Sequence, residues 1–445
     1  MRTLFFLCSV FLFAPSASAL DLLEAYHRAQ NFDARFIAAR AMLEAEREKL
    51  PQARAGLLPS LSLSGHSTLN DNRTRSSHAS TQEARYNSHS YGLSLTQPVF
   101  RQENFVAYEQ GQLIALMAEA RFSDAAQNLI LRVADAYLAV LDAQATLDAA
   151  EAQKEAIAQQ LKQAQHYFEA GVATIIDTTE AESRHDLALA QEIAALNELE
   201  IRREALYVLI GETPETLAQL RQNPPQSMPD PQTVSPWVEA AQKGNIAVQI
   251  AEFEADIADL EIARAKAGHY PTLDLVANTS KSRSRDNSGG RPTTESGNIG
   301  LQWNMPLFRG GYVSSKTREA TANRQAALAL LEAARRNAAL AARQNFLGVV
   351  NGMAQTRALS AALASSLTSL EQNKTGYEIG VRINIDVLNA EQQVFTTRRD
   401  LARARFETLL ARLRLKNATG SLNEQDLAEI NALLDTSLPQ PTISQ

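Results

Sequence analysis

Residues 102–168 read QENFVAYEQGQLIALMAEARFSDAAQNLILRVADAYLAVLDAQATLDAAEAQKEAIAQQLKQAQHYF, with no proline and a single glycine, Gly111. Proline and glycine are the residues that most disfavour a helix interior, so this stretch predicts one uninterrupted α-helix. At 1.5 Å per residue such a rod is on the order of 100 Å long. Its residues Ile130, Val133, Tyr137 and Val140 follow the 3-4-3 spacing of a coiled-coil seam. We therefore expect the rod to pack laterally against other helices.

A second rod without proline covers residues 311–377, and the chain is duplicated around the two rods. The sequence FEAGV at 168–172 matches YEIGV at 377–381, an offset of 209 residues. Upstream, LPSLSL at 58–63 matches YPTLDL at 270–275 with an offset of 212, and QPVFR at 97–101 matches MPLFR at 305–309 with an offset of 208. Self-similarity of this kind indicates repeated structural units.

The duplication predicts the organisation of the chain, with a helix, a β-hairpin and a long helical hairpin in each repeat. The expected segments are a signal peptide at 1–19, a first repeat at 20–222, a linker at 223–236, a second repeat at 237–422 and a C-terminal tail at 423–445. Gly171 and Gly380 are expected to reverse the chain at the tips of the rods, because glycine adopts φ > 0 at little cost. Return helices are expected at 178–210 and 387–418.

Four stretches alternate apolar and polar residues with period two, which is typical of half-buried strands. Leu61 and Leu63 represent the first stretch and Leu93 the second, while Leu275 and Leu301 represent the third and fourth. Prolines that suit a change from helix to strand stand at the expected junctions: Pro59, Pro98, Pro271 and Pro306. Each strand is expected to be about ten residues, the length of a tilted membrane strand, and the polar segments 70–88 and 280–296 are expected to be exposed loops.

Four strands pose a physical problem if they enter a bilayer, because lipid offers no hydrogen-bond partner to an unpaired strand edge. Roughly eight strands are the practical minimum for a closed barrel, so one chain is not enough. Two chains would give eight strands and a filled interior, and three would give twelve and a lumen. The small polar residues on the alternate face favour a wet lumen and three chains. A soluble sheet beneath a coiled coil is the alternative.

The amino terminus predicts export from the cytoplasm. Met1 and Arg2 precede an apolar run from Leu4 to Phe13, and Ala17-Ser18-Ala19 is a cleavage-site sequence. The only cysteine, Cys8, lies inside this signal, so the exported chain has neither a disulfide nor a thiol. No later run of about 18 apolar residues occurs, which excludes a polytopic helical membrane protein. A net charge of −7 argues against a nucleic-acid partner.

Catalytic and metal-binding patterns are absent from the sequence. The histidines are scattered and form no HExxH pair: His27, His66, His78, His89, His166, His185 and His269. The chain also lacks a glycine-rich phosphate loop and a nucleophile elbow. We expect no enzymatic activity, no cofactor and no metal.

The run YEIGVRINIDVLNA at 377–390 and the ending ATGSLNEQDL at 418–427, together with the duplicated layout, resemble the TolC-like outer-membrane efflux and type I secretion proteins. The resemblance covers essentially the whole exported chain. It implies a mainly α fold in which duplicated coiled-coil hairpins build an α-barrel tunnel in the periplasm. The four strands would contribute to a trimeric, twelve-stranded transmembrane β-barrel in the outer membrane of a Gram-negative bacterium.

The resemblance also implies a function and partners. A homotrimer embedded in outer-membrane lipid would form the exit duct of a tripartite export system for secreted proteins or small toxic compounds. A periplasmic adaptor (membrane fusion) protein and an inner-membrane ABC or proton-driven transporter would complete the system. The alternative is a periplasmic coiled-coil adaptor or scaffold, but an adaptor has one helical hairpin flanked by β-rich halves, whereas two hairpins are expected here. A surface adhesin stalk is disfavoured because the rods fold back.

Functional residues are carried over at the tips. The resemblance implies a tunnel-entrance acidic ring from Asp386, with Asn389 where relatives often have a second acidic residue. It implies an entrance latch of Tyr377 and Arg382 against Asp177, beside Ile176. The tips that would face the adaptor are Gly171, Val172, Gly380 and Val381. Simpler structural interpretations are helix ends for the glycines, a solvated charge for Arg382, and a helix N-cap with Glu180 as its partner for Asp177.

Overall fold

The computed structural model describes residues 19–76, 79–214, 216–221, 227–284 and 290–435. The chain divides into two compact units. The first contains residues up to 38, 124–245 and from 337 onward, and the second contains 39–123 and 246–336, so each unit draws on both halves of the sequence. Nearly all of the expected signal peptide, the start of the linker and residues 436–445 of the tail lie outside the described residues.

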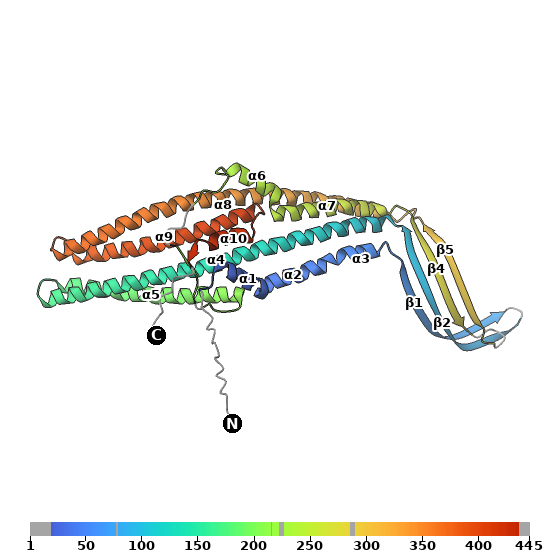
Figure 1. Cartoon of the computed structure of the whole chain (residues 1–445). Coiled ribbons are helices and arrows are strands. Elements are labelled where there is room, and N and C mark those ends of the chain that lie inside the picture. The colour runs from blue at the N-terminus through green and yellow to red at the C-terminus, as the bar shows by residue number, and fades with distance from the viewer. Residues whose placement is uncertain (1–18, 77–78, 215, 222–226, 285–289, 436–445) are drawn as a thin grey trace, which may run out of the picture. The chain divides into compact units, whose positions relative to one another are not determined.

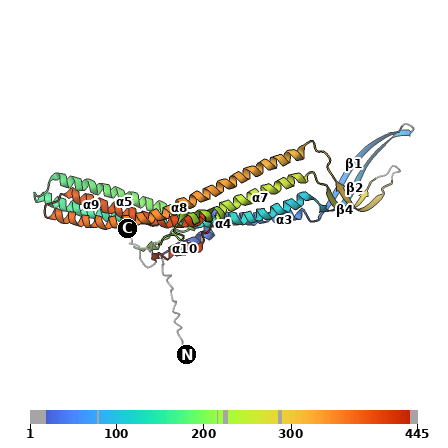
Figure 2. The same cartoon turned by 90° about the horizontal axis from the view of Figure 1, so that it is seen from above.

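The first unit is built from the distal parts of two long helical hairpins. Helix α4 (Gln102–Glu169) returns as α5 (Ile175–Ile210), and α8 (Tyr312–Glu378) returns as α9 (Asn384–Ala418). With 68 and 67 residues, α4 and α8 confirm the predicted rods. Within this unit the two hairpins lie side by side in both views (Figure 1 and Figure 2).

The predicted coiled-coil seam forms the core of this unit. Ile130, Val133, Tyr137 and Val140 are all at most 3% exposed, and Leu147 continues the buried stripe. The Tyr137 hydroxyl lies 2.9 Å from the carbonyl oxygens of two chain segments far apart in sequence, at residues 20 and 218. The rod therefore also anchors the small elements that surround its middle.

These small elements complete the first unit: α1 (Leu22–Phe32), α6 (Val234–Gly244), α10 (Glu424–Asn431), and strands β3 (Gln219–Leu220) and β6 (Leu434–Asp435), which pair antiparallel. Asn431 Oδ1 accepts a hydrogen bond from the backbone N–H of Leu22 at 2.9 Å, which fixes the start of α1 against α10. The start of α1 is thus held by α10, which lies in the segment assigned to the C-terminal tail.

The second unit contains α2 (Ala34–Arg47) from residue 39 onward, α3 (Lys49–Ala55), α7 (Ile246–Ala267) and the starts of α4 and α8. Its sheet is antiparallel in the order β1-β2-β4-β5. The strands are β1 (Ser60–Ser76), β2 (Ala79–Phe100), β4 (Thr272–Arg283) and β5 (Thr293–Asn304). Within the described residues the outer edges of β1 and β5 have no strand beside them.

The expected strand length was wrong for the first hairpin, because β1 has 17 residues and β2 has 22. The segment 70–88, expected to be a loop, continues the strands up to residues 76 and 79. Cross-strand polar pairs stabilise this extension. Asn70 Nδ2 donates to Ser88 Oγ at 2.9 Å, and Arg73 pairs with Glu83 at 2.5 Å. The segment 280–296 was also assigned wholly to a loop, but β4 extends to Arg283 and β5 begins at Thr293.

One face of the sheet, here called the outward face, carries the large apolar side chains. The cross-strand register aligns Leu63 with Leu93 and Leu275 with Leu301. These residues lie between two aromatic positions of the same alternation, Trp303 near the helices and Tyr91 near the turns. The opposite face carries small polar residues. Among the described residues, no helix is both long and apolar enough to span a membrane.

Pro59 and Pro271 immediately precede β1 and β4, and Pro306 follows β5 by two residues. Pro98 instead lies within β2, beside a register shift between Pro98 and Phe100. A bulge accommodates the missing N–H of a proline close to the end of a strand.

Candidate channel entrance

The first tip turns through Gly171, which has a φ of +72°. Helix α5 begins after Thr174, whose hydroxyl accepts from the backbone N–H of Asp177 at 3.3 Å. The Asp177 carboxylate in return accepts from the Thr174 backbone N–H at 2.9 Å and its hydroxyl at 2.7 Å. This is a capping box, so the expected N-cap role of Asp177 with Glu180 is wrong. Thr174 has the extended backbone of an N-cap and the chain enters the helix one turn earlier.

The second tip turns through Gly380, with a φ of +75°, and α9 begins after Ile383 without a side-chain cap. Arg382 lies 3.6 Å from the carboxylate of Asp386, one turn further on. Within this chain the partner of Arg382 is therefore Asp386, and no hydrogen bond or ion pair among the described residues joins it to Asp177. The i, i+4 geometry holds Arg382 over the first turn of its own helix.

Tyr377 lies close to the first tip. Its ring centre is 5.9 Å from that of Tyr167 on α4, at an angle of 43°. Burial raises the pKa of the Tyr377 hydroxyl, and the negative charge of Asp177 raises it further. The structure thus brings Tyr377 and Asp177 into the same environment, but no hydrogen bond joins them among the described residues.

A polar contact that sequence reasoning missed joins the two tips. Asn384, at the start of α9, is 1% exposed. Its carbonyl accepts from Gln160 Nε2 on α4 at 2.6 Å, and its amide donates to the backbone oxygen of Asp177 at 3.3 Å. A packed cluster that includes Ile157 and Leu388 adjoins these groups. The signal in the sequence was a polar residue at the first position of a return helix.

An ion pair between a buried carboxylate and a partly exposed lysine lies further along the second hairpin. Glu391 on α9 is 4% exposed, and Lys374 Nζ on α8 lies 3.0 Å from its Oε1. Neither carboxylate oxygen makes a well-aligned hydrogen bond with a described residue. Burial raises the pKa of Glu391, and the neighbouring Lys374 opposes that rise. Sequence reasoning missed this pair, because its members come from different helices.

The predicted acidic ring position has one carboxylate. Asp386 is one-third exposed and pairs with Arg382, whereas Asn389 Oδ1 accepts from Arg184 Nη2 at 3.1 Å. Each of the two ring positions therefore has its own guanidinium partner, Arg382 for Asp386 and Arg184 for Asn389. The charged group beside Asn389 is therefore the positive guanidinium of Arg184, whereas a second acidic residue at this position would be negative.

The tips also expose apolar side chains. Ile176 is 71% exposed, Val172 is 76% exposed and Val381 is 75% exposed. Ile175, Ile379 and Ile383 are similarly exposed. Large apolar side chains that are exposed together at a helix tip are typical of an interaction site.

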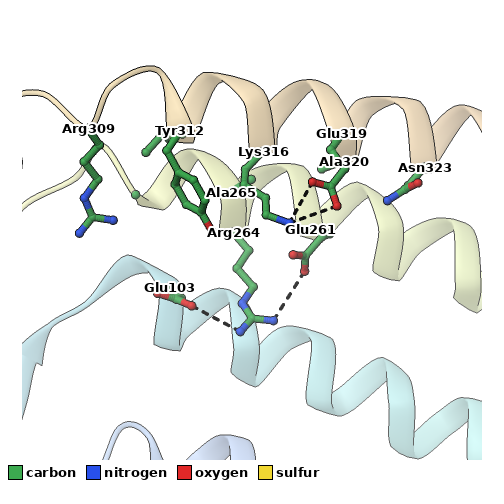
Figure 3. A pocket seen from close by; sticks show the side chains of 12 residues that line it. Glu103, Glu261, Arg264, Ala265, Arg309, Tyr312, Lys316, Glu319, Ala320 and Asn323 are labelled. Atoms are coloured by element: carbon green, nitrogen blue, oxygen red, sulfur yellow. Dashed lines mark hydrogen bonds and ion pairs between the residues drawn. The ribbon is translucent and has the colours of Figure 1, made fainter.

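Charged side chains also line a pocket in the second unit, between the starts of α4 and α8 and the end of α7 (Figure 3). Its charges pair with one another. Arg264 lies 3.4 Å from Glu103 and 3.7 Å from Glu261, and Lys316 lies 2.9 Å from Glu319. The Arg264–Glu103 pair joins α7 to α4, and charges that are already paired in this way leave few groups for a ligand. Among the described residues there is also no His, Cys, Asp and Glu cluster that could hold a metal.

Comparison with known proteins places these features in context. The sequence model of a family described as "Outer membrane efflux protein" matches residues 25–212 and 237–421. The chain is 31% identical to the outer membrane protein TolC of Escherichia coli K12, over 95% of this chain and 86% of TolC. It is 33% identical to the proteases secretion protein PrtF of Dickeya chrysanthemi, over 94% of this chain and 92% of PrtF. It is 32% identical to the alkaline protease secretion protein AprF of Pseudomonas aeruginosa, over 97% of this chain and 91% of AprF.

Solved structures share the fold. CusC superimposes with a TM-score of 0.79 at 18% identity, over 90% of this chain and 92% of CusC. VceC, an outer membrane protein of Vibrio cholerae, superimposes with a TM-score of 0.76 at 19% identity, over 90% of this chain and 96% of VceC.

Proposed function

This chain belongs to the outer membrane efflux protein family, and we propose that three copies of it form the exit duct of a tripartite export system. Members of the family are outer-membrane channels, and this protein is an export channel of the outer membrane. PrtF and AprF are named as secretion proteins and OprN as an outer-membrane channel, and we infer an adaptor and an inner-membrane transporter as the partners of this chain.

The main support for a trimer comes from the sheet. Its four strands leave the edges of β1 and β5 without a neighbour among the described residues, while its outward face is apolar between Trp303 and Tyr91. In lipid such edges must pair, and four strands are too few to close a barrel. Three copies would close twelve strands edge to edge. The small polar residues of the opposite face would then line a wet lumen.

The helical hairpins would continue this lumen through the periplasm. We propose that Tyr377, Arg382, Asp177 and Ile176 line the latch at its far end and that Asp386 and Asn389 form the entrance ring. The exposed apolar tips around Val172 and Val381 support adaptor docking there. For the chain as a whole, we retain the proposed signal peptide at 1–19, the repeats at 20–222 and 237–422, the linker at 223–236 and the tail at 423–445.

We propose secreted protein as the principal cargo. PrtF and AprF carry protease secretion in their names, and each matches more than nine tenths of both chains. Small toxic compounds are the second candidate, because the family model that matches the chain is described as "Outer membrane efflux protein".

Deletion of the gene tests the cargo. We expect specific proteins to disappear from the culture medium, and complementation to restore them. An unchanged set of secreted proteins together with a rise in drug sensitivity would instead assign the duct to small compounds. If neither changes, the proposed export function is wrong.

A further inference from the structure

We propose that the outward face of the sheet binds the phosphate groups of a lipid in the outer leaflet, just beyond its apolar band. The site is a basic cluster that consists of Arg85, His89, Arg283 and Arg291. The proposal rests on the membrane-spanning role of the sheet proposed above.

The cross-strand register places the cluster at the edge of the membrane band. His89 on β2 lies opposite Arg283 on β4, and the next outward pair toward the helices is Tyr91 with Lys281. Leu93, the next outward residue of β2 after Tyr91, is four residues from His89. At ~3.3 Å per residue, the two lie about 13 Å apart along the strand. Aromatic residues mark the interfaces of outer-membrane strands. A basic row just past Tyr91, on the side of the turns, therefore lies at the level of lipid headgroups.

The chain provides a hollow at this position. Beyond His89, β4 no longer pairs with β2, whereas the β1–β2 hairpin continues. A cavity of about 590 Å³ occupies this corner, and it is lined by Leu69, Arg85, Tyr86, Asn87, His89, Arg283, Ser284 and Arg291. Five of these positions, 69, 85, 87, 89 and 283, belong to the outward alternation. Leu69 is 70% exposed and offers an apolar wall beside the donor groups.

The cluster has an excess of positive charge. Among the described residues, Asp71 is the one carboxylate within ion-pair distance of it, 3.6 Å from Arg85 Nε. Lys281, one pair nearer the helices, is already matched by Glu295. Guanidinium groups recognise phosphate through paired, charge-assisted hydrogen bonds. Basic groups at a membrane boundary select anionic headgroups. The apolar rows below the cluster, including Leu63 and Leu93, would hold the acyl chains of the same molecule, and this continuity favours a lipid over a free ion.

Binding of lipid A to the purified trimer in detergent tests the proposal, with the same lipid after removal of its phosphates as the comparison. We expect wild-type protein to bind lipid A and to bind the dephosphorylated lipid weakly. The Arg85→Gln/Arg283→Gln variant should bind lipid A roughly tenfold or more weakly, because two charge-assisted contacts are lost. Arg85→Lys/Arg283→Lys should retain most of the binding. The control is Arg318→Gln/Arg343→Gln, which removes two exposed arginines of α8 and should bind as wild type.

Two readouts separate this site from the duct itself. The glutamine variant should still migrate as a trimer on an unheated gel and should keep wild-type single-channel conductance. Equal lipid A binding by the glutamine variant and wild type would overturn the proposal, and so would equal binding of the two lipids. If inorganic phosphate binds wild type as tightly as lipid A does, the assignment to a lipid is wrong.

Discussion

At the residue scale, the candidate entrance is organised by pairs that the sequence pattern does not reveal. Arg382 pairs with Asp386 within its own tip, and Tyr377 contacts Tyr167 across the tips. Each contact restrains one helical hairpin relative to its neighbour or its own turn. In the proposed latch, Arg382 therefore acts through its charge and Tyr377 acts through the packing of its ring.

Substitution of the latch residues is expected to open the channel. Arg382→Ser should raise the single-channel conductance in planar bilayers severalfold, and Tyr377→Phe should raise it less, because the phenyl ring can still pack on Tyr167. Lys243→Ser on α6 serves as the control and should leave conductance unchanged. Wild-type conductance in both latch variants would contradict the assignment.

Removal of Lys374 is expected to destabilise the second hairpin. Lys374→Met strands the buried Glu391 carboxylate and should cost about 1–3 kcal/mol of unfolding free energy. Lys162→Met, which removes an exposed lysine of α4, should cost much less. Thermal unfolding followed by the helical circular dichroism signal measures both. A smaller loss for Lys374→Met than for Lys162→Met would show that the pair does not contribute.

The same carboxyl predicts a pH dependence. Burial raises the pKa of Glu391 above its ordinary value of 4.5, so the folded chain binds this proton more tightly than the unfolded chain. The resulting stability is present below pH 4.5 and is lost as the pH rises through the raised pKa. Wild type should therefore lose stability relative to Glu391→Gln over this window. Parallel stability curves for the two proteins would contradict the role of Glu391.

At the element scale, the helices were predictable and the strands only in part. The absence of proline set the ends of α4 and α8 to within one or two residues, because helix breakers act locally. The extended β1–β2 hairpin was missed because its stability comes from polar pairs across two strands, such as Asn70 with Ser88. The contact of Asn384 with Gln160 was missed for a related reason, since the two residues are 224 positions apart in sequence. The pair of Glu391 with Lys374 was missed because its members lie on two different helices.

The joint between the hairpins is expected to depend on Asn384. Asn384→Ala leaves the buried Gln160 amide without its acceptor and should cost about 1–3 kcal/mol locally. Hydrogen exchange should therefore speed up in the first turns of α5 and α9. Gln393→Ala is the matched control, because this exposed amide donates to Thr397 within the same helix. Unchanged protection in the Asn384 variant would show that the two tips are joined by other contacts.

At the scale of the whole molecule, the central claim is that three chains close one barrel through β5 of one copy and β1 of the next. The internal duplication predicts the register of that contact. Leu93 on β2 pairs with Thr279 on β4. In the repeat, β5 is equivalent to β2 at an offset of 208 residues, and β1 is equivalent to β4 at an offset of 212. Position 93 therefore corresponds to Leu301, and position 279 corresponds to Ser67 of the neighbouring copy. In the same antiparallel register, residue 299 lies opposite residue 69 of the neighbouring copy, and residue 303 lies opposite residue 65.

Disulfide cross-linking tests this contact directly, because the only native cysteine, Cys8, lies in the proposed signal peptide. Chains that carry Leu301→Cys with Ser67→Cys, or one of the two adjacent pairs, are oxidised in isolated outer membranes and run on a non-reducing denaturing gel. Each single-cysteine variant is the control and should not form a covalent trimer. We expect a covalent trimer for at least one double variant, which reduction converts to monomer. Monomer alone for all three double variants would contradict a barrel closed by three copies of this sheet.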